Sequence, residues 1–197
     1  MLIIMITIHQ LLCVFVALSI FVSEGDGYKM AAPKALKVDC KSLGDNEKFI
    51  HRVKYRANAE DNITIWLFQD EELSIHFHLP EASLLEVLDV RYSNDGGMDL
   101  VKLSLDDKML GQFRSPIDYF WGIRWNKFRS SGPIGGRLIV EGGNHKLTLA
   151  ILESDKYGIE IDYIRFNVHG SKIDNLDKEV ECVHNPSHLK DHSFEDV

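Results

Sequence analysis

Apolar and polar side chains alternate between residues 48 and 168, and this period of two constrains the fold more than any other feature. In the run 73–79 every second residue is apolar, and serine and histidine occupy the positions between. The runs 101–105 and 147–151 repeat the pattern. Because successive side chains of a strand point to opposite faces, each run predicts a half-buried β-strand rather than a helix.

Further strand candidates follow one another along the same region, separated by turn sequences such as Asn94-Asp-Gly-Gly97 and Gly142-Gly-Asn144. Asparagine, aspartate and glycine favour tight turns between strands. About nine short strands with half-polar faces predict an all-β fold, an antiparallel β-sandwich or jelly roll. The additional candidates are 63–68, 84–92, 109–114, 121–128, 137–140 and 158–168.

An apolar run from Met1 to Val22 precedes the strands and is followed by small and polar residues. This order is typical of a secretory signal peptide, and the small residues Ser23 and Gly25 predict cleavage after Gly25. The run lacks a cationic start and is long enough to span a bilayer, so an uncleaved anchor is the alternative. We expect a secreted protein with no membrane association after cleavage.

Two cysteines, Cys40 and Cys182, flank the whole set of strands. Cleavage of the leader removes Cys13 and leaves an even pair in an oxidising compartment, which favours a disulfide. Closing so long a loop would stabilise the fold by on the order of 4 kcal/mol. Two free buried thiols are the alternative.

These observations predict four segments. Residues 1–25 form the signal peptide, 26–47 an N-terminal extension, 48–168 the β-sandwich domain, and 169–197 a polar C-terminal tail that contains Cys182 and is mobile beyond it. Asn62 begins the one usable N-glycosylation sequon, because Pro186 spoils the other.

The 197-residue chain carries a net charge of −8 and has no cluster of lysine and arginine, which argues against nucleic acid or an anionic membrane as its main partner. It has no nucleophile elbow, HExxH motif, phosphate loop or cofactor fingerprint. A glycosidase needs two carboxyl groups at a set distance across a cleft, which this sequence does not define. We therefore expect no catalytic residues.

Two groups of histidines are potential zinc ligands. His76 and His78 share one strand face, and three more histidines lie four residues apart in the tail, where Pro186 interrupts any helix that would align them. Solvated histidines are the simpler interpretation. The tail histidines are His184, His188 and His192.

Asp162 lies in the last strand of the domain. It shares its parity with Ile164, Phe166 and Val168, which predicts that its side chain points toward the core. A carboxylate in that position has to be paired, hydrogen-bonded or bound to a cation.

Five runs of sequence, taken together, resemble the galactose-binding-like jelly roll of family 6 and family 35 carbohydrate-binding modules. The resemblance covers roughly residues 50 to 168. The runs are 84–94, 101–111, 121–128, 138–147 and 157–166.

The resemblance implies a structural calcium ion that ties the first strand to the last through Glu60 and Asp162, whose hard oxygen ligands suit calcium. It also implies a sugar site in loops at one sandwich edge. There an aromatic at Phe120 or Trp121, with Trp66 as its partner, stacks on a pyranose. Glu160 stands where sugar-binding members often carry asparagine, and a carboxylate accepts hydrogen bonds but does not donate them.

The sequence thus predicts a secreted, non-enzymatic recognition domain that binds a glycan or an extracellular glycoprotein, with calcium as a structural ion. One alternative is a structural protein of the extracellular matrix without sugar recognition. The other is a glycan-processing enzyme, which would require a deep cleft with facing carboxylates.

Overall fold

The computed structural model describes residues 34–38, 52–169 and 181–186, and nearly all of the regular structure in these ranges is β-strand. One 3-10 turn, Glu60–Asn62, is the only helical segment among the described residues. The strands are β1 Lys34–Val38, β2 Val53–Tyr55, β3 Ile63–Leu67, β4 Glu71–Leu79, β5 Ser83–Asn94, β6 Leu100–Leu105, β7 Lys108–Arg114, β8 Phe128–Ser130, β9 Ile134–Val140, β10 Gly143–Glu153, β11 Ile159–His169 and β12 Glu181–Pro186.

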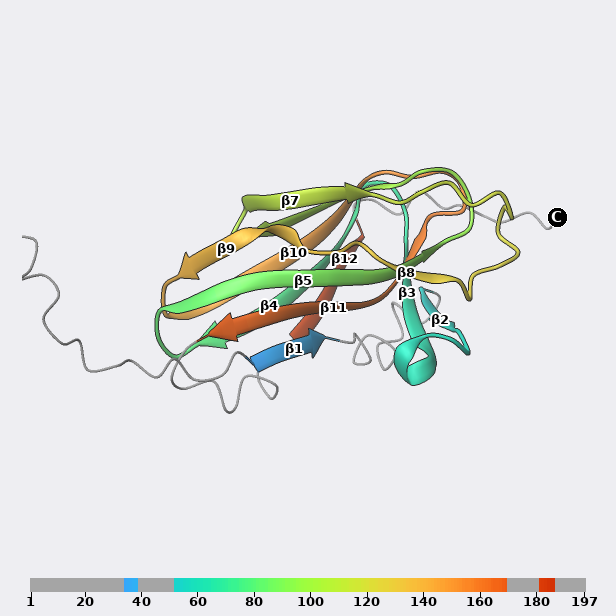
Figure 1. Ribbon diagram of the computed structural model, residues 1–197. Helices are drawn as coiled ribbons and strands as arrows, with labels where there is room; N and C mark the ends of the chain where they lie inside the picture. Colours follow the sequence, from blue (N-terminus) through green and yellow to red (C-terminus); the bar gives the residue numbers. More distant parts are fainter. Residues whose placement is uncertain (1–33, 39–51, 170–180, 187–197) are drawn as a thin grey trace, which may run out of the picture. The chain divides into compact units, whose positions relative to one another are not determined.

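The strands form two antiparallel sheets. The seven-stranded sheet has the order β2-β3-β11-β5-β8, with β1 paired to β11 and β9 paired to β5, and the five-stranded sheet has the order β12-β4-β10-β6-β7. Figure 1 shows β5 and β11 in one layer and β4 and β10 in the other. The predicted antiparallel β-sandwich is confirmed, with more strands than the nine expected.

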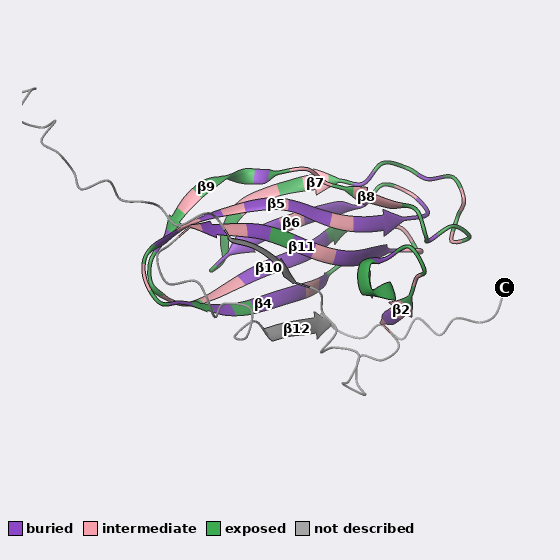
Figure 2. Ribbon diagram, turned by 60° about the horizontal axis from the view of Figure 1, so that its bottom comes forward, coloured by how far each residue is buried: buried purple, intermediate pink, exposed green. Residues whose placement is uncertain are grey.

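The core lies between the two sheets and is built from the apolar faces of their strands (Figure 2). In β4 the alternating residues from Leu73 to Leu79 are at most 3% exposed, whereas His76 and His78 are exposed. Phe77 of β4 contacts Phe166 of β11 with ring centroids 5.6 Å apart, which joins the sheets across the core. The period of two therefore identified the buried face of β4 correctly.

The predicted strand 121–128 is wrong, because this segment belongs to the loop between β7 and β8. Trp121 has φ +50° and Gly122 has φ +90°, a left-handed backbone conformation that no β-strand adopts. Only the end of the predicted strand, Phe128, begins β8.

The sandwich extends on both sides of the expected range 48–168. β1, in the segment predicted as an N-terminal extension, pairs with the end of β11, where Lys34 lies opposite Val168. β12, in the predicted tail, pairs with β4, where Cys182 lies opposite Ile75. Both flanking segments thus contribute an edge strand to a sheet.

Several predictions fall outside the described residues. The leader, its cleavage site and Cys40 lie there, as do His188 and His192, so the disulfide between Cys40 and Cys182 stays a prediction. Among the described residues, no helix is long and apolar enough to cross a membrane.

Candidate functional site

Three loops meet at one end of the sandwich, where β5 joins β6, β7 joins β8 and β10 joins β11. The backbone N–H of Gly97 donates to Asp155 Oδ2 at 2.6 Å, which ties the first loop to the third. The backbone N–H of Gly122 donates to the carbonyl of Asp95 at 2.7 Å, which ties the second loop to the first. Side chains from segments far apart in the sequence are thereby held side by side.

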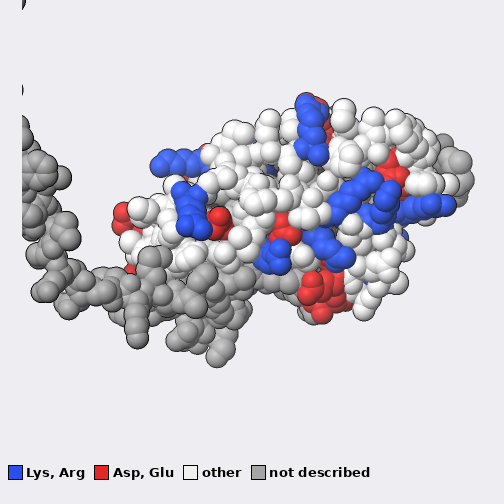
Figure 3. Space-filling model, viewed as in Figure 1, with Lys and Arg blue, Asp and Glu red and all other residues white. Residues whose placement is uncertain are grey.

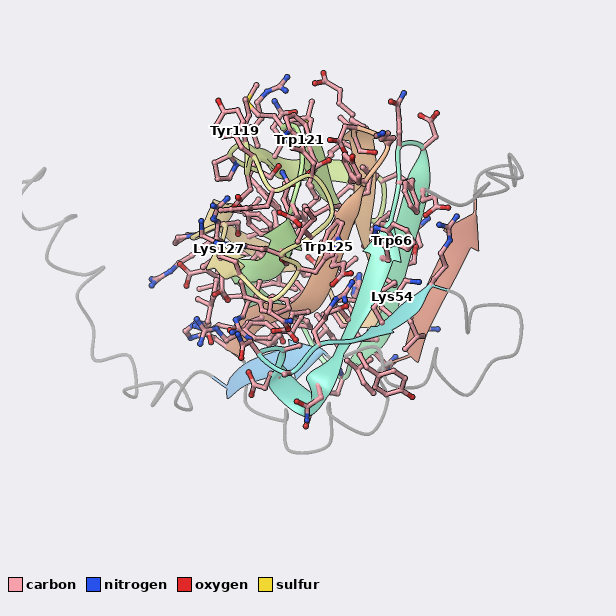
Figure 4. All side chains as sticks on the ribbon, turned by 90° about the vertical axis from the view of Figure 1, so that its right-hand side faces the viewer. Lys54, Trp66, Tyr119, Trp121, Trp125 and Lys127 are labelled. Carbon is pink, nitrogen blue, oxygen red and sulfur yellow. The ribbon has the colours of Figure 1, made fainter. Side chains whose placement is uncertain are left out.

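Tyr119, Trp121 and Tyr157 bring three aromatic rings together on these loops, and we call them the aromatic platform. The rings of Tyr119 and Trp121 are 6.2 Å apart at 73°, and those of Trp121 and Tyr157 are 6.2 Å apart at 45°. Tyr119 is 71% exposed and Trp121 is 50% exposed, and the two lie side by side at the top of the view in Figure 4. Large aromatic side chains this exposed are available for contact with a partner.

The backbone beneath the platform is fixed by hydrogen bonds and close contacts. The N–H of Tyr157 donates to Asp155 Oδ1 at 2.8 Å, and its carbonyl accepts from Trp66 Nε1 at 2.6 Å. Gly122 lies against the Tyr157 ring, because a Cβ there would be 2.9 Å from two ring carbons. The rings therefore need little rearrangement to receive a ligand.

A buried network of polar side chains stabilises the same loops. Asn94 Nδ2 donates to Ser115 Oγ at 2.8 Å, and Ser115 Oγ donates to Asp99 Oδ2 at 2.8 Å. Burial raises the pKa of Asp99 to about 7, the hydrogen bond from Ser115 lowers it, and the charge of nearby Asp155 raises it further. Asp99 thus holds a proton more readily than an ordinary carboxyl group.

The other two tryptophans form a second group on the outer face of the seven-stranded sheet. The Trp66 ring lies 4.6 Å from Phe68 and 6.2 Å from Trp125, and Lys54 Nζ lies 4.5 Å above it. Trp125 is only 9% exposed. Figure 4 shows Trp66 and Trp125 apart from the exposed rings at the top of the view. Of the three tryptophans, Trp121 is the most exposed, and Trp66 is half-buried.

The predicted aromatic pair is therefore only partly assembled. Trp66 touches the platform through its hydrogen bond to the Tyr157 carbonyl and has other ring partners of its own. Phe120 is half-buried beneath the guanidinium of Arg124, whose Cζ lies 3.8 Å from the ring centroid. Of the two expected positions, Trp121 carries the exposed ring.

Glu160 is fully buried and engaged within the protein. Its carboxylate accepts from Arg56 Nε at 3.0 and 2.8 Å, from Arg56 Nη2, and from Thr64 Oγ1 at 3.0 Å. The expectation that Glu160 lines a sugar site is corrected, since Arg56 and Thr64 hold both oxygens away from solvent.

Asp162 points to the outer face of the seven-stranded sheet, not to the core. The register of β11 against β5 shifts between Ile161 and Tyr163, and Ile161 and Ile164 both face the core. An extra residue at such a bulge reverses the parity of the side chains that follow. The simple alternation that placed Asp162 with Ile164 therefore fails at this position.

Glu60 and Asp162 do lie close together, as the resemblance implies. The contact is a hydrogen bond of 3.3 Å from the backbone N–H of Glu60 to Asp162 Oδ2, and the same oxygen accepts from Arg91 Nη1. Calcium requires several oxygen ligands, whereas this carboxylate faces hydrogen-bond donors and a cation. The arrangement does not fit a calcium ion. The described residues contain no group of three or more potential metal-ligating side chains.

The remaining predicted residues lie away from the platform. Asn62 is exposed at the end of the 3-10 turn, so a glycan there has access to solvent. His78 Nδ1 is 2.8 Å from Asn144 Oδ1 on the neighbouring strand. His184 lies in β12 opposite Leu73.

Several solved structures have a similar fold, although no protein-family model and no curated protein matches the sequence. The fold resembles that of family 6 and family 35 carbohydrate-binding modules. The family 6 module of a laminarinase from Zobellia galactanivorans is 15% identical with a TM-score of 0.46, covering 68% of this chain and 98% of that chain.

Two further structures are similar at comparable levels. A family 35 module from Clostridium thermocellum is 13% identical with a TM-score of 0.42, covering 69% of this chain and 98% of that chain. A mannanase from Podospora anserina with a family 35 module is 11% identical with a TM-score of 0.46 over 70% of this chain. This chain spans only 28% of the mannanase.

Tyr119 and Tyr157 were not among the predicted site residues. Tyr119 begins a run of three aromatics between Pro116 and Gly122, and such a run between turn-forming residues favours a loop over a strand. No local signal identifies Tyr157, because its contact with Trp121 depends on how two distant loops meet.

Proposed function

We propose that this protein is a secreted, non-catalytic recognition domain that binds glycans through the aromatic platform. The observation that carries the proposal is the set of three adjoining rings, two of them at least half exposed, on a hydrogen-bonded loop framework. The C–H-rich face of a pyranose is apolar and packs on such rings, while its hydroxyl groups remain free for polar contacts.

A glycoprotein, rather than a free glycan, is a second candidate ligand. The platform loops also expose aliphatic side chains, with Ile123 81%, Met98 50% and Ile117 40% exposed. Aliphatic groups contribute little to sugar stacking but are common where one protein contacts another. In this variant of the proposal, the platform takes the sugar and the aliphatic side chains contact the polypeptide.

Secretion and the lack of catalysis are supported by the sequence. The apolar start of the chain and the sequon at Asn62 favour an extracellular location. The absence of catalytic motifs from the sequence favours binding without chemistry.

A glycan array with the mature protein tests the proposal, followed by titration of the best ligand against Trp121→Ala and Tyr119→Ala. We expect each change to weaken binding at least tenfold, with little change in melting temperature, because these rings are exposed. Tyr55→Ala is the matched control, since Tyr55 is 79% exposed on β2, outside the platform loops. Unchanged binding by Trp121→Ala, or an equal loss in Tyr55→Ala, would contradict the proposal.

A further inference from the structure

Most acidic side chains of the platform end are buried, and Asp155 is half-buried, with its carboxylate accepting hydrogen bonds from the backbone N–H groups of Gly97 and Tyr157. Asp95, Asp99 and Glu160 are 0% exposed and Asp118 is 5% exposed. Each is held inside the protein: Asp95 by the backbone N–H of Arg124, Asp99 by Ser115, Glu160 by Arg56, and Asp118 by Lys127 and Arg129. Their negative charges are therefore largely removed from the surface that a ligand would meet.

Cations instead lie over the aromatic rings at this end. Lys156 Nζ is 5.0 Å from the centroid of Tyr157, a platform ring, and Arg124 Cζ is 3.8 Å from that of Phe120, beside Trp121. Both cations are exposed, and neither forms an ion pair with a described residue. Cation–π contact holds each charge near the platform and leaves its remaining hydrogen-bond donors open.

This local pattern is opposite to the charge of the whole chain, which is −8. Figure 3 shows lysine and arginine side chains gathered toward the loop end of the seven-stranded sheet, with acidic groups between them. Exposed acids remain in the neighbouring segments, and one of them, Glu153, is paired with Arg114 at 2.7 Å. The others include Asp70, in the turn before β4, and Glu60 and Asp61 in the 3-10 turn.

We infer that the glycan taken by the platform is acidic and carries sulfate or carboxylate groups. This inference rests on the proposed function. A sugar ring stacks on Trp121 and Tyr157, and its acidic substituent forms charge-assisted hydrogen bonds with Lys156 or Arg124. Neutral glycans lack that contact, so the charge of the glycan determines the specificity of the site. Binding of the acidic glycan weakens at high salt, because salt screens the charges.

Matched pairs of polysaccharides test the inference: dextran sulfate against dextran, and polygalacturonate against its carboxyl-reduced form. We expect at least tenfold tighter binding to the acidic member of one pair, falling steeply between 0.05 and 0.5 M NaCl. The pair that shows the difference identifies sulfate or carboxylate as the recognised group. Equal binding of acidic and neutral members, or binding independent of salt, would overturn the inference.

Charge variants separate specific contacts from general attraction. Lys156→Gln combined with Arg124→Gln should reduce binding of the acidic polysaccharide at least tenfold, and melting curves check that the double variant is folded. Lys108→Gln is the control, because Lys108 is an exposed lysine that begins β7, opposite Leu105 at the end of β6. An equal loss in the control would overturn the inference by making the attraction non-specific.

Trp121→Ala distinguishes failure of the inference from failure of the proposed function. If a neutral glycan binds and requires Trp121, the platform function stands and the acidic specificity is wrong. If the acidic polysaccharide binds equally well without Trp121, the platform function fails, and the inference that rests on it is overturned as well.

Discussion

The guanidinium of Arg91 lies against the carboxylate of Asp162 on the outer face of the seven-stranded sheet. Its second nitrogen donates to the carbonyl of Asn58 at 3.1 Å, and its Cζ lies 4.8 Å from the ring centroid of Phe128. The Asp162 side chain is 1% exposed, so this pairing compensates a buried negative charge. A side-chain cation thus pairs with the carboxylate for which the sequence resemblance implies calcium.

We therefore expect the melting temperature of the wild-type protein to be the same with calcium and with a chelator. Arg91→Gln should lower the free energy of unfolding by about 2–3 kcal/mol, less than the roughly 3–5 kcal/mol of a fully buried pair because Arg91 is 28% exposed. Adding Asp162→Asn should recover part of that loss, since no uncompensated charge remains. Denaturant unfolding measures both, and calcium-dependent melting of the wild type would instead support the metal site.

Gly122→Ala should disturb the platform without removing any aromatic ring. A Cβ at this position would lie 2.9 Å from the Tyr157 ring, and the φ of +90° is strained for alanine. We expect glycan affinity to fall several-fold and stability by about 1–2 kcal/mol. Gly132→Ala is a suitable comparison, because it has φ +71° but no atom within 4 Å, so it should lose stability and retain affinity.

The raised pKa of Asp99 predicts a dependence of stability on pH. Its pKa is about 7 in the folded protein against an ordinary 3.8, so the folded state holds a proton that the unfolded state releases between about pH 4 and 7. The free energy of unfolding should therefore fall as pH rises through this window, by at most on the order of 4 kcal/mol, and then level off. Asp99→Asn should flatten this dependence, whereas Asp107→Asn, an exposed control, should not.

Secreted protein should begin near Asp26 and carry a glycan on Asn62. The small residues Ser23 and Gly25 predict the cut, and the exposure of Asn62 leaves room for a bulky group. Intact-mass and peptide mass spectrometry check both. A membrane-bound product with Met1 intact would contradict cleavage, and an unmodified Asn62 would contradict glycosylation.

Cys40 and Cys182 should be joined by a disulfide. Removing it with Cys182→Ser should lower stability by roughly 2–5 kcal/mol, as for other native disulfides of small secreted domains. Peptide mapping without reductant measures the bond directly. Two free thiols in the secreted protein would show that the prediction is wrong.

The local sequence pattern was sufficient to identify buried residues where one face of a strand packs on the core. The alternation in β4 and the apolar run of β11 correctly identified buried residues such as Ile75 and Phe166, because burial of one face imposes a period of two. The pattern failed at Asp162, where a bulge shifts the register by one residue. It also failed at Trp121, where the backbone has a positive φ in place of the predicted strand 121–128.

The residues of the candidate site were harder to predict from sequence than the buried strand residues, because the site depends on tertiary contacts. The sequence resemblance gave Phe120 or Trp121 as the stacking aromatic, but Tyr119 and Tyr157 join Trp121 only because hydrogen bonds bring the three loops together. The sequence resemblance placed Glu160 at a sugar site, but its carboxylate accepts a hydrogen bond from Arg56, which lies 104 residues earlier in the chain. Contacts over such separations follow from how strands order themselves in the sheet, which no local pattern specifies.

The sequence by itself therefore determined that this chain forms a two-layer β-sandwich, because period-two alternation and turn residues act over a few neighbouring positions. Only the tertiary structure decided which carboxylates face solvent and which aromatic rings meet. Charge pairing such as Arg91 with Asp162 arises between strands that are adjacent in the sheet and distant in the chain. The physical reason is that the alternation of apolar and polar residues within one strand determines which of its side chains are buried. A binding surface instead depends on contacts between loops and strands that are far apart in the chain and meet only in the folded protein.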